Sequence, residues 1–468
     1  MPESSERPSL IVPALAVGLG ASIAMWAAWY VMHLPGIDAP RSASVPVMGA
    51  LLFFGVMLGV ASGGRGGRPG WLVGLLAGLV SAVLNQILLL SNLVEQPTTT
   101  EQMATEANHL QPGAPLVIVS FIGACMVAGA IAGAIGSAMG RRGPRLSSQA
   151  WLGRLGVVAA ASFLPLLVAG GAVTGTESAM AVPDPVTSYG AVSFLFPLSL
   201  MGEERIFFEH AHRLLGSLVG LVTLIWAIST TVVDRRGGMR LAVWLAWLVV
   251  VIQGVLGALR VGENSVPIAI AHGVFGQIAF MISVGVAAAQ RPSYIDAPSL
   301  ITDPTRNAAR RARTLAVFTL IAVLIQLVFG AMYRHLGSTH ALYSHIGWSF
   351  VVLVLVILTG SLCLKAGKIE RGGRPIRLVG VFMHAIVTWQ FVLGWLALWQ
   401  VPPSEHARPI PTSDQLASAT QIDALEAVIT TTHQASGALV LAAATLGLVW
   451  AWRLAQGAKG RNTPADAP

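Results

Sequence analysis

The chain of 468 residues is poor in charge, since charged residues make up 11% and apolar residues 54% of it, and its mean hydropathy is +0.69. An ordinary soluble domain has roughly 25% charged residues, so the composition excludes a soluble globular protein and indicates a polytopic membrane protein. Both cysteines, Cys125 and Cys363, lie inside apolar stretches. They give no basis for a disulfide framework or a cysteine-based zinc site.

Twelve apolar runs are each long enough, at about twenty residues, to cross the hydrocarbon core of a bilayer as a helix. Because backbone groups must be hydrogen-bonded internally in lipid, and because the runs do not alternate, we expect an all-α protein rather than a β-barrel. The first run is too long for the apolar region of a signal peptide, so we expect it to be retained. The predicted helices span residues 10–33, 46–62, 71–93, 115–139, 152–175, 206–232, 241–259, 266–289, 314–333, 342–364, 376–400 and 425–452.

Basic residues are divided unevenly between the two sides of this topology. The side opposite the N-terminus has only Arg41, Arg205, Arg260, Arg334 and Arg408, and Arg213 lies inside a helix, which leaves 23 of the 29 basic residues on the N-terminal side. The positive-inside rule therefore predicts that both termini are cytoplasmic. We expect the membrane to be a bacterial-type plasma membrane. The net charge of +8 is spread over short loops, which argues against a nucleic-acid partner.

Four histidines share one predicted depth in the membrane, namely His212, His272, His345 and His433. Each lies about three to eight residues into a helix that enters from the extracytoplasmic side, or roughly 5 to 12 Å below the outer surface. Ionisable groups inside a bilayer are costly, so these residues are candidates for function. We interpret His210 as a contact to a neighbouring helix or haem propionate and His384 as interior packing.

An internal repeat relates the four histidines. The segment QGVLG at 253–257, followed by AHGVFGQ, returns as QFVLG at 390–394, followed by THQASGA. The repeat predicts an eight-helix core of two pseudo-symmetric four-helix bundles, at residues 146–300 and 301–468, preceded by four extra helices in residues 1–145. Each bundle then has two histidines at matching depth, on its second and fourth helices.

Such a pair of neutral imidazoles suits axial coordination of a haem iron from opposite sides. Ligation of copper or zinc by all four histidines is an alternative, which their division into two separate pairs disfavours. For any single histidine, the other interpretation is a hydrogen-bonded interior residue that binds no metal.

Glu209 precedes His212 by three residues, about one helical turn, so both side chains share a face. A buried carboxylate beside a haem can accept or deliver a proton, or stabilise a carbocation on a porphyrin substituent. The alternative is an ion pair with Arg213 or Arg205. The second repeat has Leu342 at the matching position, so the asymmetry favours one haem as reactant and the other as electron carrier.

Several of these segments, in this order, resemble motifs of the haem A synthase family: GGAVTGTESAMAVPDPVTSYG at 170–190, EHAHRLLG at 209–216, AHGVFGQ and THQASGA. The resemblance covers about residues 150–455, although YSHIGW around His345 departs from the family's usual His-Arg pair. It implies an oxidoreductase that oxidises the C8 methyl of haem O to the formyl group of haem A for terminal oxidases. Electrons are then expected to pass between two haems.

The resemblance also implies roles for single residues. The expected ligands of a prosthetic haem b are His345 and His433, and the histidines expected to flank the substrate haem O are His212 and His272. Glu209 is expected to take part in catalysis, and Arg213 to contact a haem propionate. Haem O and haem A, bound near the extracytoplasmic face, are the implied small-molecule partners, with haem O synthase and oxidase assembly factors as expected protein partners in the lipid bilayer.

The first 140 residues lie outside the resemblance. The N-terminal extension, residues 1–145, contains no Asp-rich helix start of the kind that binds a prenyl diphosphate through magnesium, so we do not expect a fused haem O synthase. Assembly and partner docking both stay open as its role, and the sequence does not distinguish them. Two other functions stay open for the chain: a dihaem b-type electron-transfer protein linked to quinone, and a transporter built from parallel repeats.

Overall fold

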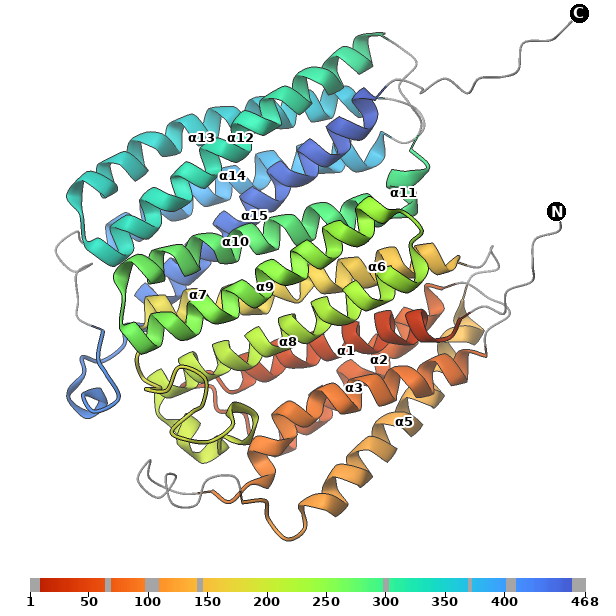
Figure 1. Cartoon of the computed structure of the whole chain (residues 1–468), viewed down its shortest axis with the longest axis vertical. Helices are drawn as coiled ribbons and strands as arrows, with labels where there is room; N and C mark the ends of the chain where they lie inside the picture. The colour runs from red at the N-terminus through yellow and green to blue at the C-terminus, as the bar shows by residue number, and fades with distance from the viewer. Residues whose placement is uncertain are drawn as a thin grey trace, which may run out of the picture. The chain divides into compact units, whose positions relative to one another are not determined.

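The structure, a computed structural model, describes residues 9–63, 69–96, 109–140, 146–297, 303–368, 373–400 and 410–456. These residues are helical apart from their loops and two isolated β-bridges. Within them, twelve segments are long and apolar enough to cross a membrane (Figure 1). The predicted all-α polytopic membrane fold with about twelve spanning helices is therefore confirmed, and the chain is an integral membrane protein.

The spanning helices lie close to the predicted runs. The largest shift is at the predicted helix 314–333, which begins at Asp303. The second helix begins at Arg41 rather than at Pro46, and Pro46 lies inside it near its start. The bounds are α1 Ile11–Met32, α2 Arg41–Ala61, α3 Gly70–Leu93, α5 Ala114–Met139, α6 Ser148–Ala161, α7 Phe163–Gly175, α8 Glu204–Val233, α9 Gly237–Glu263, α10 Val266–Gln290, α12 Asp303–Leu336, α13 Thr339–Ala366, α14 Arg374–Gln400 and α15 Ala424–Ala455.

One predicted helix, 152–175, is broken into α6 and α7 at Ser162. Pro165 lies in the first turn of α7, where it lacks the N–H that would bond to the carbonyl of Ala161, and its ring crowds that carbonyl. The Ser162 hydroxyl donates a hydrogen bond to the carbonyl of Ala159 at 2.7 Å. Both α6 and α7 pack against α8.

Contacts divide the chain into two compact units, Met1–Ser265 with Pro409–Asp423, and Val266–Arg408 with Ala424–Pro468. In the second unit, α12 packs against α13 and α15, α14 packs against the same two helices, and α10 packs against α12 and α15. The short helix α11, Pro292–Ile295, follows α10. The three-part division predicted at residues 145 and 300 stays a prediction.

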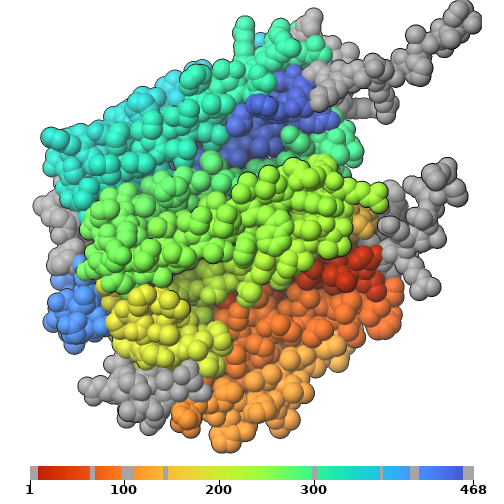
Figure 2. All heavy atoms as spheres, in the orientation of Figure 1, coloured from red at the N-terminus to blue at the C-terminus, as the bar shows by residue number. Residues whose placement is uncertain are grey.

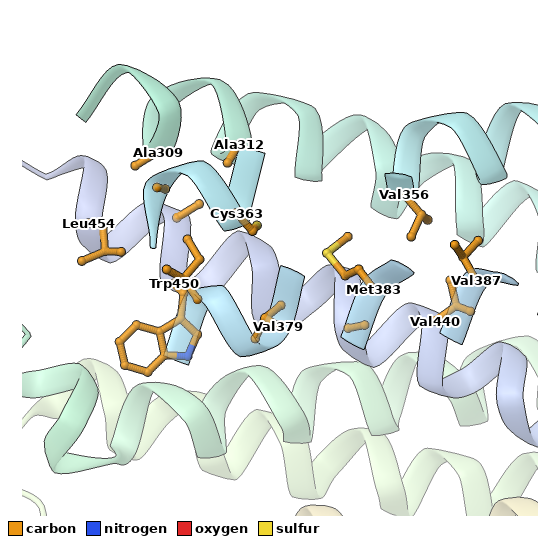
Figure 3. Close-up of a cluster of buried hydrophobic side chains, with 14 of the residues drawn as sticks. Ala309, Ala312, Val356, Cys363, Val379, Met383, Val387, Val440, Trp450 and Leu454 are labelled. Carbon is orange, nitrogen blue, oxygen red and sulfur yellow. The ribbon is translucent and has the colours of Figure 1, made fainter. Parts of the chain in front are cut away.

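The second unit has a closely packed apolar core, drawn in Figure 3. Val356 of α13, Cys363 of α13 and Met383 of α14 are each 0% exposed and belong to one cluster with Val440 of α15. Lipid tails are as apolar as these side chains, so close van der Waals packing, rather than escape from water, stabilises this core.

In the first unit, α3 and α5 approach each other so closely that only glycine fits between them. A Cβ added at Gly74 would lie 2.1 Å from the carbonyl oxygen of Gly129, and one added at Gly129 would lie 2.3 Å from that of Gly74. Gly70 and Gly133 make a similar contact one turn away. Small residues spaced by four along both helices let the two backbones touch, which is a common way to join helices in lipid.

We expect Gly129→Val to destabilise the protein by about 1–3 kcal/mol, because the new side chain would have to displace the α3 backbone. Thermal unfolding in detergent measures the effect as a lower midpoint. Gly123→Val is the matched control, since a Cβ at Gly123 on the same helix meets nothing within 4 Å. Equal midpoints for the two variants would contradict the close α3–α5 contact.

Candidate functional site

The segment between α7 and α8 folds over the start of α8 and includes two short helices, η1 Ser193–Leu195 and η2 Leu198–Gly202. Arg213 of α8 holds this segment by its two terminal nitrogens. One donates to the carbonyls of Asp184 at 2.7 Å and Thr187 at 2.8 Å, and the other to the carbonyl of Val182 at 3.0 Å. Figure 2 shows the segment, in yellow, as a compact group of atoms.

Glu209 lies under this segment and is 4% exposed. Its Oε1 accepts a hydrogen bond from Arg213 at 2.6 Å, and its Oε2 accepts one from the backbone N–H of Val182 at 2.8 Å. The ion pair with Arg213 that the sequence offered as an alternative is therefore present. The carboxylate is fixed in one orientation, and its catalytic role stays a prediction.

The rest of the segment packs around His210, which is 0% exposed. Its Nδ1 lies 3.2 Å from the hydroxyl of Ser188, and its ring centre lies 4.5 Å from that of Phe196. The Tyr189 hydroxyl donates to the carbonyl of Ala181 at 2.7 Å. Burial raises the pKa of Tyr189, and the carboxylates of Glu203, Glu209 and Asp184 raise it further, so the phenol stays protonated and keeps this hydrogen bond.

His212 lies on α8, and its ring contacts α7 at a glycine. A Cβ added at Gly170 would lie 3.0 Å from Cε1 of His212. A larger residue at 170 would therefore displace the ring. His272 lies on α10, in the second unit, whereas His212 lies in the first. The predicted pairing of these two histidines stays a prediction.

The second unit brings His345 of α13 and His433 of α15 together. Their ring centres lie 6.2 Å apart, with the ring planes at 77°. A metal-bound imidazole nitrogen lies about 2.0 Å from the metal and about 1.1 Å from its ring centre, so two rings on opposite sides of one metal have centres roughly 6 Å apart. The spacing of this pair fits two axial ligands of one iron.

The ring of His345 is held from α12. Its Nδ1 donates to the backbone carbonyl of Gln326 at 3.1 Å, which leaves the lone pair on Nε2. The side-chain amide of Gln326 donates to the carbonyl of His345 at 2.9 Å and reaches Nε2 at 3.3 Å, which is long for a hydrogen bond. A Cβ added at Gly330 would lie 2.9 Å from Cε1 of this ring.

The ring of His433 is held in a similar way from α14. The side-chain nitrogen of Gln390 lies 3.2 Å from Nδ1, and the other amide atom of Gln390 accepts a hydrogen bond from the hydroxyl of Ser436. A Cβ added at Gly394 would lie 3.3 Å from Cε1 of His433. The ring-to-glycine contacts at Gly170, Gly330 and Gly394 are thus alike in kind.

The four histidines lie somewhat further into their helices than the three to eight residues expected, and their depth in a membrane stays a prediction. They lie six to nine residues after the first residue of α8, α10, α13 and α15, or roughly 9 to 14 Å along the helix axis. His384 of α14 is engaged elsewhere, with its Nδ1 2.7 Å from the carbonyl of Gly380 and its Nε2 3.2 Å from the hydroxyl of Ser361. This agrees with its interpretation as interior packing.

Sequence reasoning did not single out Gln326, Gln390, Gly330 or Gly394 as site residues. The available signal was a glutamine followed by a glycine four residues later on a helix beside a candidate histidine. The chain matches no protein-family model, no curated protein and no solved structure. The geometry and the sequence motifs therefore have to support any assignment.

We expect Arg213→Met to release the segment between α7 and α8. Hydrogen exchange at the backbone amides of residues 179–192 should become about tenfold faster or more, because each hydrogen bond from a charged donor contributes about 1.5–3 kcal/mol. Ser217→Ala, one turn along α8, is the control, since the Ser217 hydroxyl bonds only to the carbonyl of Arg213. Unchanged exchange in Arg213→Met would show that other contacts hold the segment.

Proposed function

We propose that this protein is a membrane oxidoreductase of the haem A synthase type, which oxidises the C8 methyl of haem O to the formyl group of haem A. The observation that carries the haem-binding part of the proposal is the pair His345 and His433, whose ring centres lie 6.2 Å apart. Their neutral imidazoles, on glycine-lined helix faces, fit a resident haem b. When bound, haem supplies one-electron iron chemistry.

The residues of the first unit support a reaction rather than electron transfer alone. Glu209 is buried one turn before His212, and both of its oxygens are held by hydrogen bonds. The fixed carboxylate can hold a proton or a positive charge beside His212. His212 and His272 are the proposed histidines at the substrate haem O, and Arg213 contributes by holding both Glu209 and the covering segment.

Sidedness and partners belong to the same proposal. The bias of basic residues supports cytoplasmic termini, with both haem sites near the extracytoplasmic face. Haem O synthase, as the source of substrate, and oxidase assembly factors, as acceptors of product, are the proposed protein partners.

A dihaem b-type electron-transfer protein linked to quinone is the second candidate, and the same histidine pair favours it equally. The two candidates differ in what they require of Glu209. An electron carrier needs no acid beside its haem, whereas an enzyme that moves protons does.

We expect Glu209→Gln to lower conversion of haem O to haem A by about a hundredfold or more, because loss of a general acid or base typically has this effect. The assay expresses the full chain with a source of haem O and quantifies extracted haems by chromatography. Glu204→Gln is the control, an exposed acid in the first turn of the same helix, and it should convert haem O normally.

If the haem-loaded wild type makes no haem A, the enzyme proposal is wrong and the electron carrier is favoured. A Glu209→Gln variant that converts haem O at the wild-type rate would remove Glu209 from the mechanism.

A further inference from the structure

A five-residue pattern, Gln-x-Val-x-Gly, lies beside both His345 and His433. It occurs as QLVFG at 326–330 in α12 and as QFVLG at 390–394 in α14. In each copy the glycine contacts Cε1 of a histidine, and the glutamine one turn earlier reaches a nitrogen of the same ring. The pattern therefore both admits a ring between two helices and limits how the ring can turn.

The orientation of the Gln390 amide and the position of the ring proton on His433 are linked. The Gln390 amide nitrogen donates to Nδ1 at 3.2 Å, so in this arrangement the ring proton is on Nε2. An imidazole that ligates iron through Nε2 needs its proton on Nδ1, with an acceptor for that proton. The same Gln390 has such an acceptor in its amide oxygen, which here accepts from Ser436.

A half-turn of the Gln390 amide exchanges its oxygen and nitrogen without moving any other heavy atom. The oxygen then accepts from Nδ1 of His433, and the nitrogen donates to the hydroxyl of Ser436. That hydroxyl can accept because its own proton is free to go to the carbonyl of Thr432, 2.8 Å away. The absence of a side chain at Gly437 leaves room, since a Cβ there would lie 3.2 Å from the amide nitrogen.

We propose that Gln390 is a positioning residue for His433, whose amide turns by half a revolution to accept the Nδ1 proton and thereby sets the orientation of this ligand and the redox potential of the haem. The inference rests on the proposed function only in requiring that His345 and His433 bind a haem. Accepting a hydrogen bond from Nδ1 makes the imidazole a stronger donor to iron, which favours the ferric state and lowers the potential.

Gln326 provides a contrast within the same pair. Nδ1 of His345 donates to the backbone carbonyl of Gln326, which a substitution of the side chain leaves in place. The Gln326 amide instead points at Nε2, the nitrogen that would bind iron. Substituting Gln326 therefore removes a group that competes with iron for Nε2 of His345. Substituting Gln390 removes the hydrogen-bond partner of Nδ1 of His433.

The experiment compares Gln390→Leu, Gln390→Glu and Gln326→Leu in the full-length chain, loaded with haem b alone. Spectroelectrochemical titration gives the redox potential, and haem titration gives the affinity. For Gln390→Leu we expect a higher potential and an affinity lower by about tenfold to a hundredfold. Gln390→Glu retains an acceptor and should keep a potential at or below that of the wild type. Gln326→Leu should bind haem at least as tightly as the wild type, without a higher potential.

The possible failures are distinguishable. A wild type that binds no haem would overturn the proposed function and this inference together. A wild type that binds haem, with Gln390→Leu equal to it in potential and affinity, would overturn the inference alone. If Gln390→Leu fails to fold, Gln390→Glu decides the question. A redox potential in Gln390→Glu above that of the wild type would also overturn the proposed role of Gln390 as a hydrogen-bond acceptor.

Discussion

The constraint on which this structure depends is that a histidine ring inside a lipid-embedded helix bundle needs both space and a hydrogen-bond partner from a neighbouring helix. Glycine supplies the space at Gly170 beside His212, at Gly330 beside His345 and at Gly394 beside His433, and Gly360 makes the same kind of contact with His384. In water a polar ring can be hydrated, but in hydrocarbon each unmet polar group costs free energy. Backbone or side-chain partners on adjacent helices meet this need in the second unit.

The two units use buried polar groups differently. In the second unit one group of polar contacts holds the rings of His345 and His433. In the first unit they join Glu209 and Arg213 to the backbone of the segment that follows α7. A reaction that moves protons needs a fixed acid and a cover that excludes water, whereas a site that only passes electrons needs neither. The difference agrees with one reacting haem and one electron-carrying haem.

The sequence predicted the twelve spanning helices well, because hydrocarbon thickness and the need for internal hydrogen bonds determine length and type of element. It missed the α6–α7 break, where Pro165 ends regular hydrogen bonding inside an apolar run. The position of the four histidines six to nine residues into their helices follows from the helix starts. The contacts of Gln390 and Arg213 were not predictable, because an amide or guanidinium partner depends on how loops and helices of distant sequence meet. Arg213 holds the covering segment by three carbonyls, and its expected contact with a haem propionate stays a prediction.

The central claim is that His345 and His433 together hold one haem, and haem content tests it most directly. Full-length wild type, His345→Ala, His433→Ala and His384→Ala are purified from cells that make only haem b, and haem is measured per protein chain by its reduced pyridine spectrum. The account predicts that His345→Ala and His433→Ala each lose about one haem per chain relative to the wild type, while His384→Ala, a control within the same unit, loses none. Equal haem content in all four proteins, or its absence from the wild type, would contradict the account.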